Sequence, residues 1–216
     1  MKILISGATG LIGTALIPVL EHDGHSITRL VRGTPRTTSQ EIPWTPGQPL
    51  DPALVEPFDA VIHLAARNIG VRWNEKIKRD LIESRVQGTR TIAEATAAAF
   101  LGSGRPLTFI SAAAIGYYGS RGDEVLTDAS MSGNGFLSEI ARQWEAATQA
   151  ASDAGVRVVL PRLVWSSAPK AADSLACFPR SGWASEVPLA ADVNGSAGSV
   201  SKTLWVGSAS RLRLPA

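Results

Sequence analysis

Short apolar runs alternate with helical patterns along the first three quarters of the chain. Runs rich in apolar and β-branched residues predict strands at 2–6, 26–32, 59–66, 107–111 and 156–160, with a further short strand near 41–44. Apolar positions at helical spacing predict helices over 11–20, 74–100 and 135–154. Strands that alternate with helices form a parallel sheet covered on both faces. The pattern therefore predicts the α/β fold class and a doubly wound parallel sheet.

Two of the predicted helices carry more specific expectations. In the first, the residues expected to pack on the sheet are Leu11, Ile12, Ala15, Leu16, Val19 and Leu20. Pro18 lies inside the same helix and is expected to kink it or to lower its stability. The segment 74–100 is charged in its first half and alanine-rich in its second. That composition is typical of one long helix, or of two joined ones, with a solvated charged face.

A glycine-rich turn, GATGLIG at 7–13, stands directly between the first strand and the first helix. Gly7 permits the tight turn, Gly10 lets phosphate oxygens approach the backbone, and Gly13 lets the helix pack closely on the strand. Free N–H groups and the positive end of the helix dipole suit a pyrophosphate, and Thr9 can add a hydroxyl donor. This context favours a dinucleotide site over glycines that serve the turn alone. The candidate cofactor-binding residues here are Gly7, Thr9, Gly10, Leu11, Ile12 and Gly13.

Two further strand ends carry cofactor-binding candidates. The second strand ends in Arg32 with no acid beside it, and Arg36 follows. An acid there binds the ribose 2′-hydroxyl of NAD, whereas an arginine accommodates the 2′-phosphate of NADP, so NADP is favoured over NAD. Alternatively, Arg32 is a solvated strand end. At the end of the strand 59–66, His63 is expected to be packed rather than to act as a base. The residues that leave space for a cofactor against the sheet are Leu64, Ala65 and Ala66.

Bulk composition narrows the class of protein. The 216 residues carry a net charge of +2, which gives no strong attraction to nucleic acid or to anionic membranes. The single cysteine, Cys177, excludes an internal disulfide and fits a reducing compartment. No apolar run is long enough to cross a bilayer, and the glycine turn begins too early for a signal peptide. We therefore expect a cytoplasmic protein with a small-molecule substrate, no metal site and no nucleic-acid or membrane partner.

Four motifs carry a family resemblance. They are GATGLIG at 7–13, HLAA at 63–66, RW-x-E with SRVQGTR within 72–90, and SAAAIGYYGSRGDEVLT at 111–127. Together they resemble the atypical or extended short-chain dehydrogenase/reductases, and among these the epimerase-like family called NAD-dependent epimerase/dehydratase. The likeness covers residues 1–162. It implies an NADP-binding Rossmann domain and redox or epimerase chemistry on a small substrate, which can be nucleotide-linked.

The catalytic pair of that wider superfamily is absent. The superfamily transfers hydride with a Tyr whose pKa is lowered by a Lys four positions further on. Counted from Trp144, the matching places hold Leu137 and Ala141, and similar sequences carry a second hydroxyl where this one has Ala113. Arg142 is a candidate for the missing cation. The remaining candidate proton donors are Ser111, Tyr117 and Tyr118, for which aromatic packing and a strand-end cap are the alternative roles.

Residues 163–216 break the pattern. They are rich in Ser, Ala, Gly and Pro without a sustained period, where the resemblance implies a strand, a glycine-rich loop, a helix and the substrate-binding lobe. Reading the last base of each codon with the first two of the next permits family-like segments within this stretch. We therefore expect a Rossmann domain at 1–162 and an aberrant, poorly packed, out-of-frame tail at 163–216, with the substrate lobe missing. A divergent low-complexity C-terminus is the alternative.

Two functions from different classes follow. The first is an epimerase-like oxidoreductase domain that binds NADP(H), with activity impaired by the loss of the substrate lobe. The second is a non-catalytic dinucleotide sensor or regulatory protein, which fits the absent Tyr/Lys pair equally well. The sequence names neither the substrate nor the oligomeric state.

Overall fold

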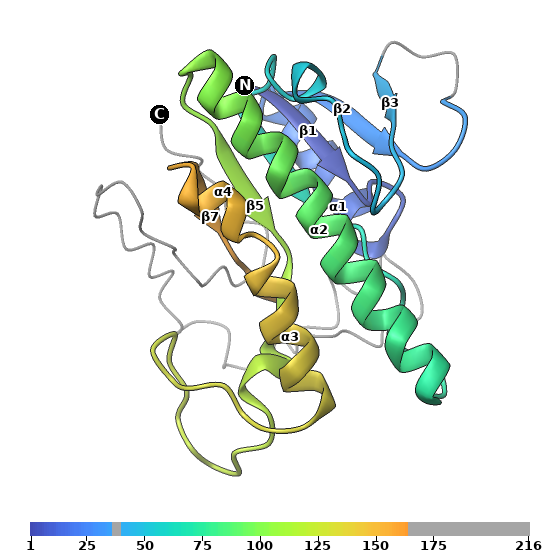
Figure 1. Ribbon diagram of the computed structural model, residues 1–216, viewed down its shortest axis with the longest axis vertical. Coiled ribbons are helices and arrows are strands. Elements are labelled where there is room, and N and C mark those ends of the chain that lie inside the picture. The colour runs from blue at the N-terminus through green and yellow to red at the C-terminus, as the bar shows by residue number, and fades with distance from the viewer. Residues whose placement is uncertain (36–39, 164–216) are drawn as a thin grey trace.

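A computed structural model gives the structure of the chain and describes residues 1–35 and 40–163 (Figure 1). The predictions for the tail from residue 164 onward, and for Arg36, lie outside the described residues. The division into a domain at 1–162 and an aberrant tail therefore stays a prediction.

Six parallel strands form one sheet in the order β3-β2-β1-β4-β5-β7. They are β1 (Lys2–Ser6), β2 (Ser26–Val31), β3 (Glu41–Pro43), β4 (Ala60–His63), β5 (Thr108–Ser111) and β7 (Arg157–Val159). The strand order reverses at β1, which pairs with β2 on one side and β4 on the other. In sheets of this kind, ligands bind outside the carboxyl ends of the strands at the reversal. The predicted α/β class and parallel sheet are confirmed.

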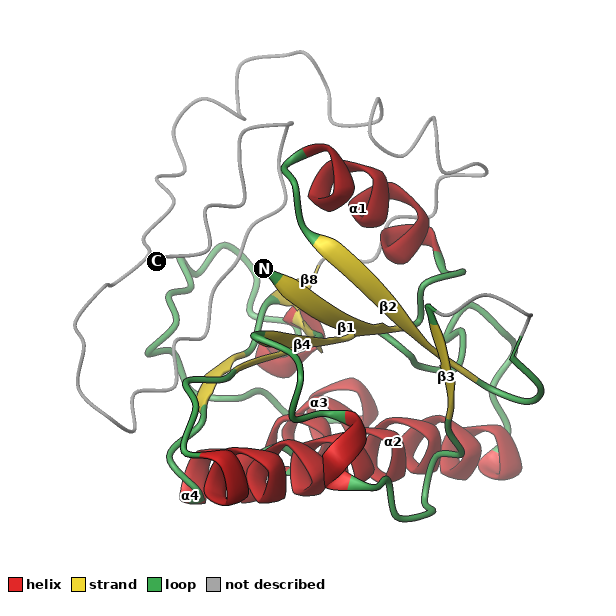
Figure 2. Cartoon of the chain, turned by 90° about the horizontal axis from the view of Figure 1, so that it is seen from above, coloured by secondary structure: helices red, strands yellow, loops and turns green. Residues whose placement is uncertain are grey.

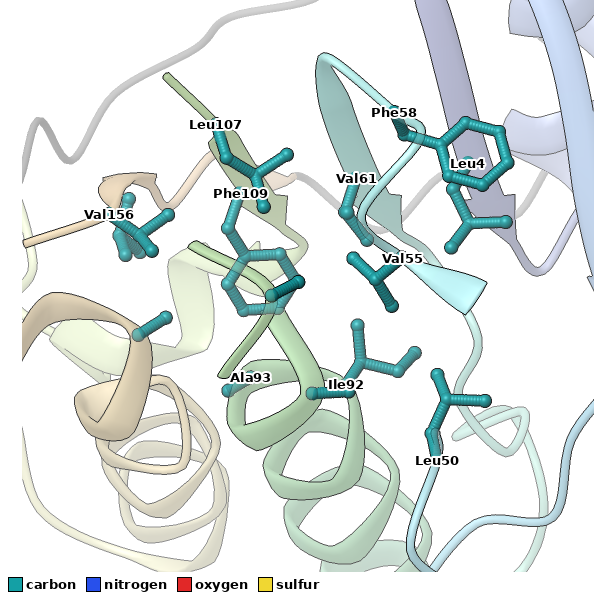
Figure 3. Close-up of a cluster of buried hydrophobic side chains, with 14 of the residues drawn as sticks. Leu4, Leu50, Val55, Phe58, Val61, Ile92, Ala93, Leu107, Phe109 and Val156 are labelled. Carbon is teal, nitrogen blue, oxygen red and sulfur yellow. The ribbon is translucent and has the colours of Figure 1, made fainter. Parts of the chain in front are cut away.

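Helices cover both faces of the sheet. α1 (Leu11–His22) lies on one face, while α2 (Glu75–Ser103), α3 (Phe136–Ala146) and α4 (Gln149–Asp153) lie on the other (Figure 2). Successive side chains of a strand point to opposite faces. Accordingly Ile3 and Ile5 of β1 belong to the core under α1, whereas Leu4 belongs to the core under α2 (Figure 3). The chain thus builds two cores on one sheet.

Shorter elements complete the described chain. A second parallel pair joins β6 (Ala113–Ala114) to β8 (Arg162–Leu163), just beyond the carboxyl end of β5. The 3₁₀ helices are η1 (Pro52–Leu54) and η2 (Ile115–Tyr118). η2 contacts α3, so the segment that follows β5 is held against the helical layer.

α2 is one continuous helix, as one of the two sequence-based alternatives predicts. Its N-terminus is capped by Asn74, whose side-chain oxygen accepts a hydrogen bond of 2.8 Å from the backbone N–H of Ile77. Its C-terminus is closed by Gly104, whose φ of +64° suits glycine. The alanines of its second half are largely buried, which lets the helix lie close to the sheet.

The predicted buried face of α1 is partly wrong. Leu11, Ile12 and Val19 are 41%, 38% and 48% exposed, whereas the buried residues of the helix are Gly13, Ile17 and Leu20. These three follow the spacing i, i+4, i+7 and form one narrow stripe against the sheet. The helices α2, α3 and α4 lie on the opposite face of the sheet, so they do not cover the flanks of α1 (Figure 2). Pro18 does not end the helix, which continues to His22.

The helix predicted over 135–154 is divided into two. The break falls at Ala147 and Thr148. The Ala147 N–H is shared between the carbonyls of Gln143 at 3.1 Å and Trp144 at 3.2 Å, and the Thr148 N–H bonds the Glu145 carbonyl, three residues back, at 3.1 Å. The Thr148 hydroxyl also donates to the Glu145 carbonyl at 2.7 Å. A side-chain hydroxyl that bonds a carbonyl of its own helix competes with the regular backbone hydrogen bonds of that helix. The spacing of apolar residues does not reveal this competition, so it predicted one continuous helix.

Candidate functional site

The turn after β1 has a geometry that only glycine permits at two positions. Gly7 has a φ of +76°, and a Cβ there would lie 2.7 Å from the backbone nitrogen of Ala65. A Cβ on Gly13 would lie 2.4 Å from the carbonyl oxygen of Gly7. Gly10 instead has an ordinary φ of −78° and accepts the first bond of α1 as its N-cap. The glycines therefore press the start of α1 onto β1 and β4.

This turn fits a pyrophosphate. The Gly10 cap makes no side-chain hydrogen bond, and the first turn of α1 holds no acidic residue. The N–H groups at the start of a helix have no partner within the helix and lie at the positive end of its dipole. An anion bound there meets free donors and no opposing carboxylate from the helix itself.

A cavity of about 1570 Å³ opens above this turn, at the carboxyl ends of β1, β2 and β4. Its lining includes seven of the predicted cofactor-binding residues, namely Gly7, Thr9, Gly10, Arg32, Leu64, Ala65 and Ala66. Leu11 and Ile12 lie exposed at the start of α1, and Gly13 is buried beneath the turn. None of these last three belongs to the lining. The structure thus gathers most of the predicted cofactor set around one space.

Arginines gather at the β2 end of this cavity. Arg29 pairs with Glu21 of α1 at 3.7 Å. Arg32 is exposed and makes no ion pair or hydrogen bond within the described residues, although it lines the cavity with Trp44. An unpaired guanidinium at the end of the second strand suits an added phosphate group on the ribose.

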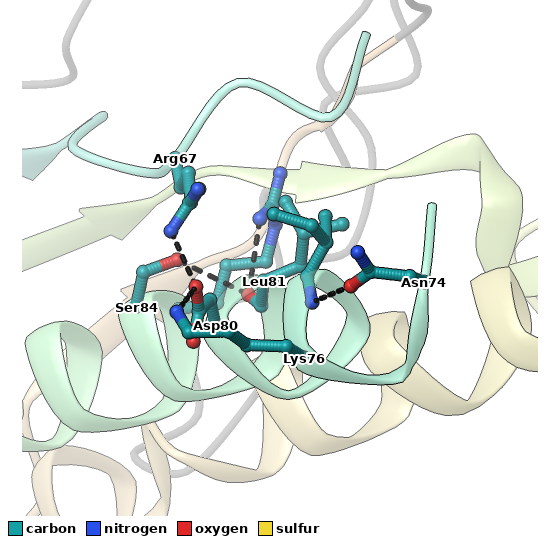
Figure 4. Close-up of polar contacts among 8 residues, drawn as sticks. Arg67, Asn74, Lys76, Asp80, Leu81 and Ser84 are labelled. Carbon is teal, nitrogen blue, oxygen red and sulfur yellow. Dashed lines mark hydrogen bonds and ion pairs between the residues drawn. The ribbon is translucent and has the colours of Figure 1, made fainter. Parts of the chain in front are cut away.

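The opposite wall of the cavity contains residues that sequence reasoning missed. Arg67 Nη1 lies 2.7 Å from Asp80 Oδ2, and Lys76 Nζ lies 3.1 Å from the same oxygen (Figure 4). The hydrogen bond from Lys76, opposed by partial desolvation, holds the pKa of Asp80 below its usual value. Asp80, Ser84 and Gln87 line the cavity from α2. Their spacing of four and then three residues puts them on one face of the helix. That spacing is the sequence feature from which this wall of the cavity could have been predicted.

His63 is packed inside the sheet, as predicted. It is fully buried, its Nδ1 lies 2.6 Å from the Ser6 hydroxyl of β1, and its ring meets Trp44 edge-on at 6.0 Å. Burial lowers the pKa of His63 to about 3, so the ring is neutral at physiological pH. Its Nε2 has no hydrogen-bond partner within the described residues. Ser6 is the partner that the sequence alone does not reveal.

The three candidate proton donors do not line the cavity. Ser111 is fully buried at the end of β5, and its hydroxyl has no partner within the described residues. The Tyr118 hydroxyl accepts a hydrogen bond of 2.6 Å from Arg162, whose guanidinium lies 3.7 Å from the ring centre of Tyr117. Their catalytic roles stay predictions.

The cation beside the tyrosines is Arg162, and the expectation for Arg142 is wrong. Arg142 pairs with Glu139 on the same helix and donates to the Gly133 carbonyl at 2.9 Å. Arg162 instead binds Glu145 with two hydrogen bonds, at 2.7 and 2.9 Å. Burial acts to lower the pKa of Arg162, but the charge and hydrogen bonds of Glu145 outweigh it, and the net shift is upward. The contact between Arg162 and Tyr118 is not evident from the sequence. The two residues are far apart in the chain and meet only because β8 lies beside η2.

The sequence of this chain is similar to proteins of one known family. The sequence profile of the NAD dependent epimerase/dehydratase family matches residues 3–169. This chain belongs to that family. An epimerase family protein of Mycobacterium leprae is 37% identical over 162 residues, which are 74% of this chain and 51% of that protein. The chain spans about half the length of the curated relatives that it matches.

Two solved structures are similar to the described fold. A nucleoside-diphosphate sugar epimerase from Corynebacterium glutamicum is 40% identical, with a TM-score of 0.64 over 75% of this chain and 33% of its own. The human epimerase family protein SDR39U1, solved with NADPH, is 29% identical, with a TM-score of 0.61 over 75% of this chain and 53% of its own. Both likenesses support the Rossmann-like arrangement.

Within residues 1–35 and 40–163, none of the helices has the length and apolar character needed to cross a membrane. The same residues contain no group of three or more His, Cys, Asp or Glu side chains that could hold a metal ion.

Proposed function

We propose that this protein binds NADP(H) across the glycine turn and serves as the cofactor-binding half of an epimerase-type oxidoreductase. The observation that carries the proposal is the turn itself. A Cβ on Gly7 or Gly13 would lie 2.7 or 2.4 Å from backbone atoms, so only glycine fits at these two positions, and the cavity opens at the helix start beside them. The NADPH bound by human SDR39U1 supports the same class of cofactor.

The preference for NADP over NAD rests on Arg32. Its side chain is exposed at the end of β2, lines the cavity and has no competing acid bonded to it within the described chain. A 2′-phosphate placed there would gain charge-assisted hydrogen bonds that a 2′-hydroxyl cannot make. NAD would still contact the glycine turn and the small side chains of Ala65 and Ala66 that follow β4.

The chemistry proposed for this family member is redox chemistry on a small molecule. A bound nicotinamide cofactor supplies or accepts hydride. The residues of this chain would bind the pyrophosphate at 7–10 and keep the cofactor against the sheet at Leu64 and Ala65. Tyr117 is the candidate proton donor, although it lies outside the cavity lining. Because residues 163–216 lack the pattern expected of a substrate-binding lobe, we propose that turnover is impaired while cofactor binding is retained.

A non-catalytic dinucleotide sensor is the second candidate. It is favoured by the environment of the tyrosines, since the Tyr118 hydroxyl is already bonded to Arg162 and is buried. Leu137 and Ala141 also occupy the places of the usual Tyr/Lys pair. A sensor would bind NADP(H) as the enzyme does, but would not oxidise NADPH with any carbonyl substrate.

Fluorescence titration of the full chain with NADPH tests the cofactor site. Gly10→Val is expected to weaken binding by at least about tenfold, because its φ accepts valine while the side chain obstructs the phosphate approach. Gly102→Val is the matched control, since Gly102 is exposed on α2 with open space around it. Equal NADPH affinity in the Gly10 and Gly102 variants, or no binding by the native chain, would refute the proposal.

The same titration, repeated with NADH, tests the preference. Arg32→Ala is expected to weaken NADPH binding roughly 10- to 100-fold, the loss of one charge-assisted contact, and to leave NADH binding within about twofold. Arg79→Ala, which removes an exposed arginine of α2 away from the cavity, is expected to change neither. An equal loss for both cofactors would contradict a 2′-phosphate contact.

A further inference from the structure

Two arginines are buried within the described residues, and their surroundings differ. Arg162 is 4% exposed, and its charge is matched by the bidentate contact with Glu145. Arg85 of α2 is 6% exposed and has no acidic partner in the described part of the chain. Its hydrogen bond there goes to the Leu81 carbonyl of its own helix, at 3.1 Å. One buried cation is therefore neutralised and the other is not.

Arg85 lies beyond the carboxyl end of β4. Gly88 faces His63, the last residue of that strand, because a Cβ on Gly88 would lie 3.7 Å from the His63 ring. Arg85 precedes Gly88 by three residues on the same face of α2, one helical turn nearer the N-terminus of the helix. Since α2 returns from the carboxyl edge of the sheet, that turn places Arg85 at the edge where ligands of such sheets bind.

The contact with Trp144 fixes the guanidinium in place. It lies 5.0 Å from the centre of the Trp144 ring, and the indole N–H of Trp144 donates to the Thr89 hydroxyl at 2.9 Å. The aromatic face attracts the cation but supplies no negative charge. Burial lowers the pKa of Arg85 to about 10, so the guanidinium stays charged at neutral pH. Within the described residues only the bond to Leu81 uses a donor of Arg85, so most of its five donors have no acceptor there.

Other polar groups at the same edge also lack partners within the described residues. They are Nε2 of His63 and the hydroxyl of Ser111, the terminal residues of the adjacent strands β4 and β5. Buried polar groups are normally satisfied, and a buried charge especially so. A buried cation without a counter-ion, at the same edge of the sheet as two unsatisfied polar atoms, indicates a place where the missing acceptor comes from outside the described chain.

We propose that Arg85 is the anion-binding group of the substrate site and holds a carboxylate or phosphate oxygen of a small-molecule substrate. This inference rests on the proposed function, because it assumes that substrate approaches the same edge as the cofactor. The cofactor is not the expected ligand, since the cavity is lined by Ser84 and Gln87 on α2 but not by Arg85. A planar guanidinium suits carboxylate and phosphate oxygens equally, so the shared chemistry is an oxyanion.

Calorimetric titration of the NADPH-saturated full chain with inorganic phosphate, and separately with acetate, tests this site at constant ionic strength. Saturating NADPH occupies the turn, so phosphate cannot bind there instead. We expect saturable binding of at least one of the two anions. Arg85→Met is expected to weaken it at least tenfold, Arg85→Lys by a smaller factor, and Arg90→Met, which removes an exposed arginine of the same helix, not at all.

The outcomes separate this proposal from the cofactor proposal. Arg85→Met is expected to leave NADPH affinity within twofold, so a parallel loss of NADPH binding would assign Arg85 to the cofactor and overturn the inference. Absence of saturable phosphate and acetate binding in the native chain would also overturn it, whether or not NADPH binds. If Arg85→Met fails to fold, unchanged anion affinity in the charge-conserving Arg85→Lys variant would mark a structural role.

Discussion

His63 shows how burial converts one residue into a source of pH dependence. Its pKa falls from 6.5 to about 3 because the ring is fully buried, while an unfolded chain keeps the ordinary value. Between those two values the unfolded state binds a proton that the folded state does not. Stability therefore falls as pH falls below about 6.5.

Lowering the pH from 7 to 5 is expected to cost about 2 kcal/mol of unfolding free energy through His63 alone. Urea unfolding of the native chain and of His63→Gln at both pH values measures this contribution. It is the difference between the two proteins in how much the unfolding free energy changes with pH. The variant is less stable overall, because it loses the Ser6 contact, but its stability depends less on pH. His22→Gln, at an exposed position, should keep the native slope; an unchanged slope in His63→Gln would contradict the assignment.

The Arg162–Glu145 pair is a second residue-scale test. Its side chains are 3% and 9% exposed, so removal of one partner leaves the other charge buried. Arg162→Leu is expected to lower the free energy of unfolding by about 3–5 kcal/mol. The double variant Arg162→Leu/Glu145→Leu should recover most of that loss, as urea unfolding can show. Equal stability of the single and double variants would indicate that Glu145 is solvated.

At the scale of elements, α2 depends on its first turn. Asn74 bonds the N–H of Ile77, and Trp73 beside it packs edge-on against Phe136 of α3 at 5.3 Å. Asn74→Ala is expected to cost about 1 kcal/mol of unfolding free energy through the lost cap. Asn74→Ser keeps a capping oxygen and should cost less; thermal unfolding distinguishes them. Equal losses for the two variants would show that the cap bond contributes nothing.

The elements also show where sequence patterns are sufficient. A strand run such as 2–6 specifies its own element because its period and its flanking glycines are local. The division between α3 and α4 depends on a hydroxyl bonding back to Glu145, and the buried stripe of α1 depends on which side of the helix meets the sheet. Apolar spacing predicts that a helix is amphipathic, but its orientation is set by the neighbours that it meets.

At the scale of the whole molecule, the chain spans about half the length of its curated relatives, and the family profile matches it over residues 3–169. That the tail from residue 163 departs from the family stays a prediction. The out-of-frame interpretation predicts a single-nucleotide insertion or deletion near codons 160–163. Sequencing the gene there checks it directly. One uninterrupted frame, with the same tail present in close relatives, would refute it. A cytoplasmic location likewise stays a prediction.

The sequence by itself determined the alternation of strands and helices, the glycine turn and seven of the residues that line the cavity. Those features are local, because each strand, each strand end and the turn is formed by a short run of consecutive residues. Only the tertiary structure decided the partners of His63, Arg85 and Arg162. Their contacts join segments far apart in the chain, and burial fixes whether each charge or ring nitrogen is matched, a property that no single segment contains.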